Sequence, residues 1–135
     1  MTDIVLNKVQ SIQRCVSRAR EEYRADPDGF DANFTRQDAA ILNILRACEQ
    51  TIDLANHTAA TRKLGVPATT AETFELLRQA GIIDAELAEK LINMVRFRNI
   101  VIHQYRSTDL EIVKSAILSG LNDLILFGDR ILEEG

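Results

Sequence analysis

The sequence has no tryptophan, only two prolines, two cysteines and six glycines among 135 residues. So few glycines and prolines leave little room for the tight turns of an all-β fold. Cys15 and Cys48 match neither a disulfide framework nor a metal-ligand spacing, so we expect buried, reduced thiols. No apolar run approaches the roughly 20 residues of a membrane span, and the N-terminus does not have the form of a signal peptide. We therefore expect a cytoplasmic protein that does not associate with membranes.

The chain also has no excess of positive charge, and its net charge is −4 at pH 7. Bulk charge therefore cannot supply nonspecific affinity for nucleic acid, and any such contact has to use a local basic patch. One candidate lies between Glu89 and Asp109, where no acidic residue occurs. That segment contains His103 and four cations, which are Lys90, Arg96, Arg98 and Arg106.

Apolar residues recur at alternating spacings of three and four in four long stretches, which is typical of amphipathic helices. These stretches cover residues 5–23, 41–59, 87–105 and 113–131, and a shorter one covers residues 74–77. No stretch has the alternation of a strand. The predicted fold is all-α, an antiparallel four-helix bundle with one additional short helix, in a single domain spanning residues 1–135.

Capping residues predict the helix ends. Asp84 can cap the fourth helix, and Gly65 and Gly81 are expected to close the helices that precede them. Three patterns resemble capping boxes, namely Thr35 with Asp38, Thr69 with Glu72, and Thr108 with Glu111.

The helix predicted over residues 87–105 is apolar around most of its circumference, because Ile92, Phe97 and Ile100 lie outside its main apolar stripe. Such a helix is either central or covered by a second protomer. We expect a homodimer with this helix near the interface.

Residues 98–105 read Arg-Asn-Ile-Val-Ile-His-Gln-Tyr. Arg98 falls within the apolar stripe, where a charge costs free energy unless it pairs with an opposite charge or binds a ligand. At about 100° per residue, Arg98 and Tyr105 share a face, whereas His103 points about 140° away and lies on the side of Asn99. Arg98 and His103 could meet in a cleft reached from both flanks, through distortion of the helix end, or across a dimer axis.

A structural role is the alternative for each of these residues. Arg98 could pair with an acid of another helix, and Glu49 and Asp53 share one helical face because they are four residues apart. Tyr105 could equally be an interface or core tyrosine. The basic run in the first helix is interleaved with glutamates and indicates a solvated face, with an RNA-tracking role as the second possibility; it comprises Arg14, Arg18, Arg20 and Arg24.

The segment 98–105 resembles the Arg-x-x-x-x-His-x-Tyr signature of the HepT-like branch of the HEPN superfamily. The resemblance covers nearly the whole chain and includes the patterns at residues 49–55, 73–77, 80–83 and 94–99. It implies a dimeric, metal-independent endoribonuclease that acts as a toxin and requires no cofactor. It further implies an adjacent minimal nucleotidyltransferase antitoxin, which silences the toxin by adenylylating the signature tyrosine, here Tyr105.

The residue types suit this chemistry, because RNA carries its own nucleophile, the 2′-hydroxyl. His103 is expected to move the proton as general base or acid, and Arg98 to clamp the phosphate. Asn99 would orient His103 or bind RNA, and further substrate-binding or orienting residues are Arg96, Arg106, Glu49 and Asp53. Two other functions stay open: a non-catalytic module that binds nucleotide or a nucleotidyltransferase, and a structural dimerisation bundle in which Arg98 forms a buried ion pair.

Overall fold

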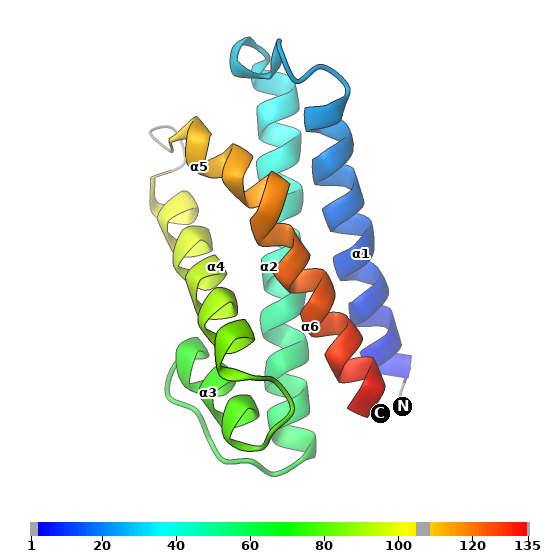
Figure 1. The fold of residues 1–135 in the computed structure, drawn as a ribbon, viewed down its shortest axis with the longest axis vertical. Coiled ribbons are helices and arrows are strands. Elements are labelled where there is room, and N and C mark those ends of the chain that lie inside the picture. Colours follow the sequence, from blue (N-terminus) through cyan, green and yellow to red (C-terminus); the bar gives the residue numbers. More distant parts are fainter. Residues whose placement is uncertain (1–2, 105–108, 135) are drawn as a thin grey trace.

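The structure, a computed structural model, describes residues 3–104 and 109–134, and within these ranges every regular element is helical. The elements in chain order are α1 (Asp3–Arg24), η1 (Phe30–Ala32), α2 (Phe34–Thr61), α3 (Thr70–Gln79), α4 (Ala85–His103), α5 (Leu110–Ser115), η3 (Ala116–Gly120) and α6 (Leu121–Glu134). The all-α prediction is confirmed. The four long rods are α1, α2, α4 and the run from α5 through η3 to α6, and α3 is the additional short helix (Figure 1).

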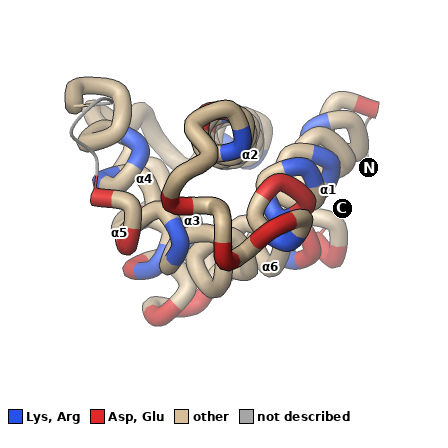
Figure 2. Tube along the Cα trace, turned by 90° about the horizontal axis from the view of Figure 1, so that it is seen from above, with Lys and Arg blue, Asp and Glu red and all other residues tan. Residues whose placement is uncertain are grey.

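Successive rods run in opposite directions, so that both ends of the chain lie at the same end of the bundle (Figure 1). The view along the bundle places α2 between α1 and α4, with α6 on the opposite side (Figure 2). The interior is a single cluster of apolar side chains from all four rods, which includes Ile12, Ile44, Leu91 and Leu124. Phe74 of α3 joins this cluster and packs edge-to-face on Phe127, with ring centroids 5.8 Å apart. The periodicity of the sequence therefore corresponds to one shared core.

Three of the predicted helix ends are confirmed. The Thr69 hydroxyl accepts a hydrogen bond from the Glu72 N–H at 3.2 Å, and the Asp84 carboxylate accepts from the Leu87 N–H at 2.8 Å. Gly81 ends α3 with φ of 77°, a conformation that favours glycine.

The predicted ends of α2 are wrong at both sides. The helix begins at Phe34, because the Asn33 side chain accepts a hydrogen bond from the Arg36 N–H at 3.0 Å, so Thr35 lies inside the first turn. At the other end Lys63, with φ of 57°, takes the left-handed position expected of Gly65. The Leu64 N–H then donates to the Ala59 carbonyl at 3.0 Å, as in a Schellman motif.

The last rod, predicted as one helix, contains a turn of π-helix at η3. Thr108, its predicted cap, lies outside the described residues, and Asp109 caps α5 by accepting from the Glu111 N–H at 2.9 Å. At Gly120 a Cβ atom would lie 2.6 Å from the Met94 sulfur, so the absence of a side chain allows the rod to approach α4 closely. This contact lies one helical turn before Arg98.

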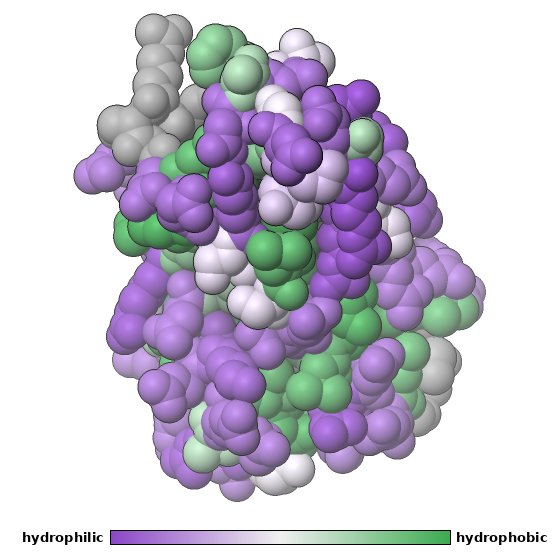
Figure 3. Space-filling model, turned by 45° about the horizontal axis from the view of Figure 1, so that its top comes forward, coloured by the Kyte–Doolittle hydropathy of each residue, from purple (hydrophilic) through white to green (hydrophobic). Residues whose placement is uncertain are grey.

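Both cysteines are free thiols, but only Cys48 is buried, because Cys15 is half-buried. In the part of the chain that the structure describes, no helix combines the length and the apolar character needed to cross a bilayer. On the face shown in Figure 3, apolar side chains lie in several groups separated by hydrophilic ones.

Candidate active site

The last two turns of α4 carry Arg96, Arg98, Asn99 and His103. The helix continues without a break to His103, and Gln104 ends it with a non-helical backbone (φ −132°, ψ 39°). Helical geometry therefore holds between Arg98 and His103, and distortion of this segment does not bring the two side chains together. A cleft reached from both flanks and a dimer axis are the two possibilities that stay open.

Arg98 is held by a carboxylate on the neighbouring helix. Its Nε donates to Glu49 Oε1 at 2.6 Å, and one terminal nitrogen contacts the same oxygen. The Arg98 side chain is 24% exposed and the Glu49 side chain 45% exposed, so the pair lies at the surface of the α2–α4 contact. A purely structural role predicts a buried ion pair, and the observed pair is not buried. Partly exposed pairs of this kind contribute up to about 1 kcal/mol to stability.

Asn99 bonds to Arg98 and not to His103. Its Oδ1 accepts a hydrogen bond from a terminal nitrogen of Arg98 at 2.8 Å. Together, Glu49 and Asn99 fix the guanidinium from two sides. The guanidinium has five N–H donors, so these contacts leave donors free for phosphate oxygens.

His103 is exposed on the last turn of α4. Within the described residues its ring has no hydrogen-bond or ion-pair partner, so the imidazole is open to solvent and to a substrate. Arg96 precedes His103 by seven residues and shares its face. Arg96 is exposed and donates to Asn93 Oδ1 at 3.2 Å. The histidine side of α4 therefore carries a second cation.

Of the two carboxylates predicted near Arg98, only Glu49 reaches it. Asp53 lies one turn further along α2 and pairs with Lys8 of α1 at 3.6 Å. The structure thus assigns Asp53 to the α1–α2 contact. The site residues predicted from the sequence do not include Arg46, which lies one turn before Glu49 on α2. Residues three apart on a helix are neighbours, so the spacing of Arg46 and Glu49 could have shown that a further cation lies beside Glu49.

Cys48 lies next to Glu49 and faces the core. Burial raises the pKa of its thiol to about 12, and the nearby charge of Arg98 opposes this shift only in part. The thiol therefore stays protonated at neutral pH and is a poor nucleophile or metal ligand.

Two predicted residues, Tyr105 and Arg106, lie outside the described residues. Among the residues that are described, no group of three or more His, Cys, Asp or Glu side chains is placed to hold a metal ion. The site consists of an anchored guanidinium, an amide and an open imidazole. These groups can bind a phosphodiester and move a proton.

Comparison with known proteins gives one consistent result. Residues 12–131 match the family model described as Ribonuclease HepT-like. The chain is 40% identical to the mRNA nuclease HepT of Shewanella oneidensis, in an alignment that covers 99% of this chain and all of that protein.

Solved structures agree with this match. The tri-AMPylated Shewanella oneidensis HEPN toxin in complex with MNT antitoxin superposes with a TM-score of 0.92 at 39% identity, covering 98% of this chain and 99% of that one. A crystal structure of a toxin–antitoxin with AMP-PNP superposes with a TM-score of 0.91 at 38% identity and the same coverage.

Proposed function

The chain belongs to the HepT-like ribonuclease family, and on that premise we propose that it is a metal-independent endoribonuclease toxin of a type II toxin–antitoxin system. It acts in the cytoplasm as a homodimer, cleaves RNA, and is silenced by a minimal nucleotidyltransferase antitoxin. The mRNA nuclease HepT, 40% identical over the full length, supports the RNA substrate. The relatives solved as toxin–antitoxin complexes support the partner.

One observation carries the catalytic assignment. The Arg98 guanidinium is anchored by Glu49 and Asn99 while His103, five residues later on the same helix, is exposed. An anchored guanidinium binds phosphate oxygens with little loss of side-chain entropy. An exposed imidazole can accept or give a proton without first having to break a contact within the protein.

The reaction follows from these positions. Arg98 binds the non-bridging oxygens of the scissile phosphate and stabilises the charge that develops there in the transition state. His103 accepts the proton of the 2′-hydroxyl, and the 2′-oxygen attacks phosphorus. The bond from phosphorus to the 5′-oxygen breaks, and that oxygen takes up a proton. The products are a 2′,3′-cyclic phosphate and a 5′-hydroxyl end.

A second protomer supplies the second proton in this scheme. Arg98 and His103 point about 140° apart on one helix, so a cleft between two copies is the simplest place for both to reach one phosphodiester. Ile100 and Ile102, on the same turns of α4, are 50% and 51% exposed. A second copy that packs on α4 at either isoleucine buries that side chain and brings His103 of each protomer to a common cleft.

The antitoxin acts at Tyr105, two residues beyond the end of α4. Adenylate attached there adds a negatively charged phosphate close to the cationic segment, where it competes with RNA for Arg98. The tri-AMPylated state of the HEPN toxin in a solved complex supports this mode of silencing.

The function is tested with the two histidines of the chain, His57 and His103. In a buffer with excess chelator, the purified chain is expected to cleave single-stranded RNA. His103→Ala is expected to lose at least about 100-fold in rate, the usual contribution of a general acid or base. His57→Ala, on the half-buried side of α2, is the matched control and retains activity.

Equal cleavage by His103→Ala and the unchanged chain would contradict the catalytic assignment. Intact RNA in every sample, together with measurable binding of nucleotide, would favour the non-catalytic module instead.

A further inference from the structure

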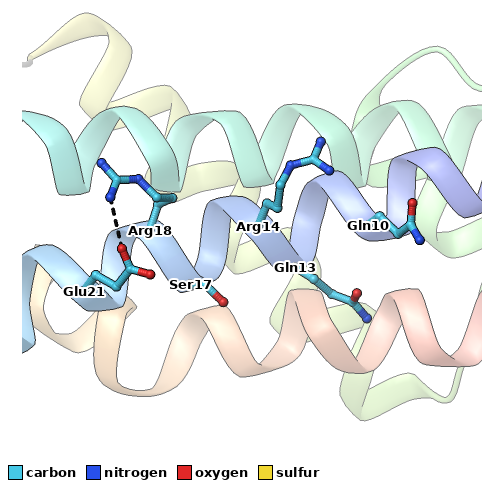
Figure 4. A pocket seen from close by; sticks show the side chains of 6 residues that line it. All are labelled: Gln10, Gln13, Arg14, Ser17, Arg18 and Glu21. Atoms are coloured by element: carbon cyan, nitrogen blue, oxygen red, sulfur yellow. Dashed lines mark hydrogen bonds and ion pairs between the residues drawn. The ribbon is translucent and has the colours of Figure 1, made fainter.

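A groove separate from the Arg98 site runs between α1 and α2. It has a cavity volume of about 480 Å³ and a polar lining of Ser11, Arg14 and Arg18 from α1 with Asn43 and Arg46 from α2. In the close view along α1, Arg14 and Arg18 extend toward α2 (Figure 4). No Asp or Glu is among the lining residues, so this α1–α2 groove is positively charged on a chain whose net charge is −4.

Two of the three guanidinium groups in the α1–α2 groove are unneutralised. Arg18 pairs with Glu21 at 3.0 Å and with Glu22 at 3.6 Å. Arg14 and Arg46 are exposed, and within the described ranges no carboxylate pairs with either. Free, exposed guanidinium groups are well suited to phosphate oxygens, because their planar donors match two oxygens at once.

The groove adjoins the candidate active site through α2. Arg46 and Glu49 are three residues apart and are therefore neighbours on the helix surface, and Glu49 holds Arg98. Cationic groups thus follow one another from Arg98 on α4, over Arg46 on α2, to Arg14 on α1. The tube view shows several Lys and Arg positions along α1, the rod that lies next to α2 (Figure 2).

The lining also indicates which part of a nucleic acid fits. None of its residues is aromatic, so the α1–α2 groove offers no surface on which bases stack. Guanidinium, hydroxyl and amide groups bind phosphate and sugar, and such contacts position a strand without reading its sequence.

We propose that the α1–α2 groove binds the phosphodiester backbone of single-stranded RNA beside the cleaved bond, with Arg14 and Arg46 as the main phosphate ligands. This inference rests on the proposed ribonuclease function. It makes the groove a source of affinity for long RNA and leaves the choice of cleavage site to the residues around Arg98.

The test measures how RNA binding depends on salt. The double variant Arg14→Gln/Arg46→Gln is made in a His103→Ala chain, so that the RNA stays intact, and the Kd for a long single-stranded RNA is measured by fluorescence anisotropy. On single strands each phosphate contact contributes about −0.7 to the slope of log affinity against log salt. Loss of two contacts makes the slope shallower by about 1.4. The His103→Ala parent therefore binds the RNA more tightly than the double variant by a factor that shrinks about sevenfold between about 50 and 200 mM salt.

The matched control is Arg62→Gln/Arg130→Gln in the same His103→Ala chain. It removes the same charge, but Arg62 pairs with Glu134 at 3.3 Å and Arg130 with Glu133 at 3.4 Å, away from the groove. This control is expected to keep the parent's slope. Circular dichroism on each variant checks that the helical fold is retained.

The proposal is overturned if the groove variant has the parent's Kd and slope. It is also overturned if the variant loses only its affinity for a nucleotidyltransferase antitoxin, which would make the groove a protein interface. The ribonuclease function is judged separately, by RNA cleavage with the unchanged chain and its dependence on His103.

Discussion

Glu49 has the most specific structural role in the proposed site, because it is the residue that orients Arg98. Its Oε1 accepts from Arg98 Nε at 2.6 Å and also contacts a terminal nitrogen of the same guanidinium. We predict that Glu49→Ala lowers kcat about fivefold. A charge-assisted contact to a guanidinium that is 24% exposed is worth about 1 kcal/mol after screening by solvent. Because about 1.4 kcal/mol in the transition state is tenfold in rate, a loss of about 1 kcal/mol is about fivefold.

The same variant is expected to change stability by less than about 1 kcal/mol, since the ion pair lies at the surface. The effect therefore appears in kcat and not in folding. Glu49→Gln keeps an oxygen that accepts from Nε, so it is expected to recover most of the lost rate. Steady-state cleavage of a labelled RNA, combined with urea unfolding, separates the two effects.

Asp53→Ala is the matched control, because Asp53 is a carboxylate one turn away on the same helix and pairs with Lys8 instead of Arg98. It is expected to keep the kcat of the unchanged chain. If Glu49→Ala and Asp53→Ala have the same kcat, the idea that Glu49 positions Arg98 is refuted.

Two further predictions concern Tyr105 and Cys48. Coexpression with a nucleotidyltransferase antitoxin should raise the intact mass of the chain by whole adenylate units and abolish RNA cleavage, whereas Tyr105→Phe should gain no mass at that residue; peptide mapping that finds adenylate only elsewhere would contradict the assignment. In a Cys15→Ser chain, Cys48 should resist maleimide until urea unfolds the protein, because burial raises the pKa of its thiol to about 12. The folded state therefore holds this proton more tightly than the unfolded state, whose thiol ionises near pH 9, so this contribution to the free energy of unfolding falls as the pH rises from about 9 toward 12. The thiol is not buried in solution if maleimide labels Cys48 rapidly in the native protein, or if its contribution to the free energy of unfolding grows between about pH 9 and 12.

Much of the site followed from the sequence, because helical periodicity is a local property of the chain. The spacing of apolar residues gave the four rods and the directions of Arg98 and His103 on α4, and α4 is helical through both residues. The caps at Thr69 and Asp84 were predictable for the same reason, since each involves contacts within one turn. Local chemistry was misleading at both ends of α2, where Asn33 and not Thr35 caps the helix and Lys63 and not Gly65 takes the left-handed position.

The tertiary structure decided which groups meet. Glu49 and Asp53 are equivalent in the sequence, one turn apart on one helical face, yet Glu49 binds Arg98 and Asp53 binds Lys8. The close approach of Gly120 to Met94 and the groove containing Arg14 and Arg46 likewise depend on neighbouring rods. A sequence pattern specifies the direction of a side chain around its own helix axis. The height and rotation of one helix against the next are set by packing of the whole core, and these determine which carboxylate reaches which cation.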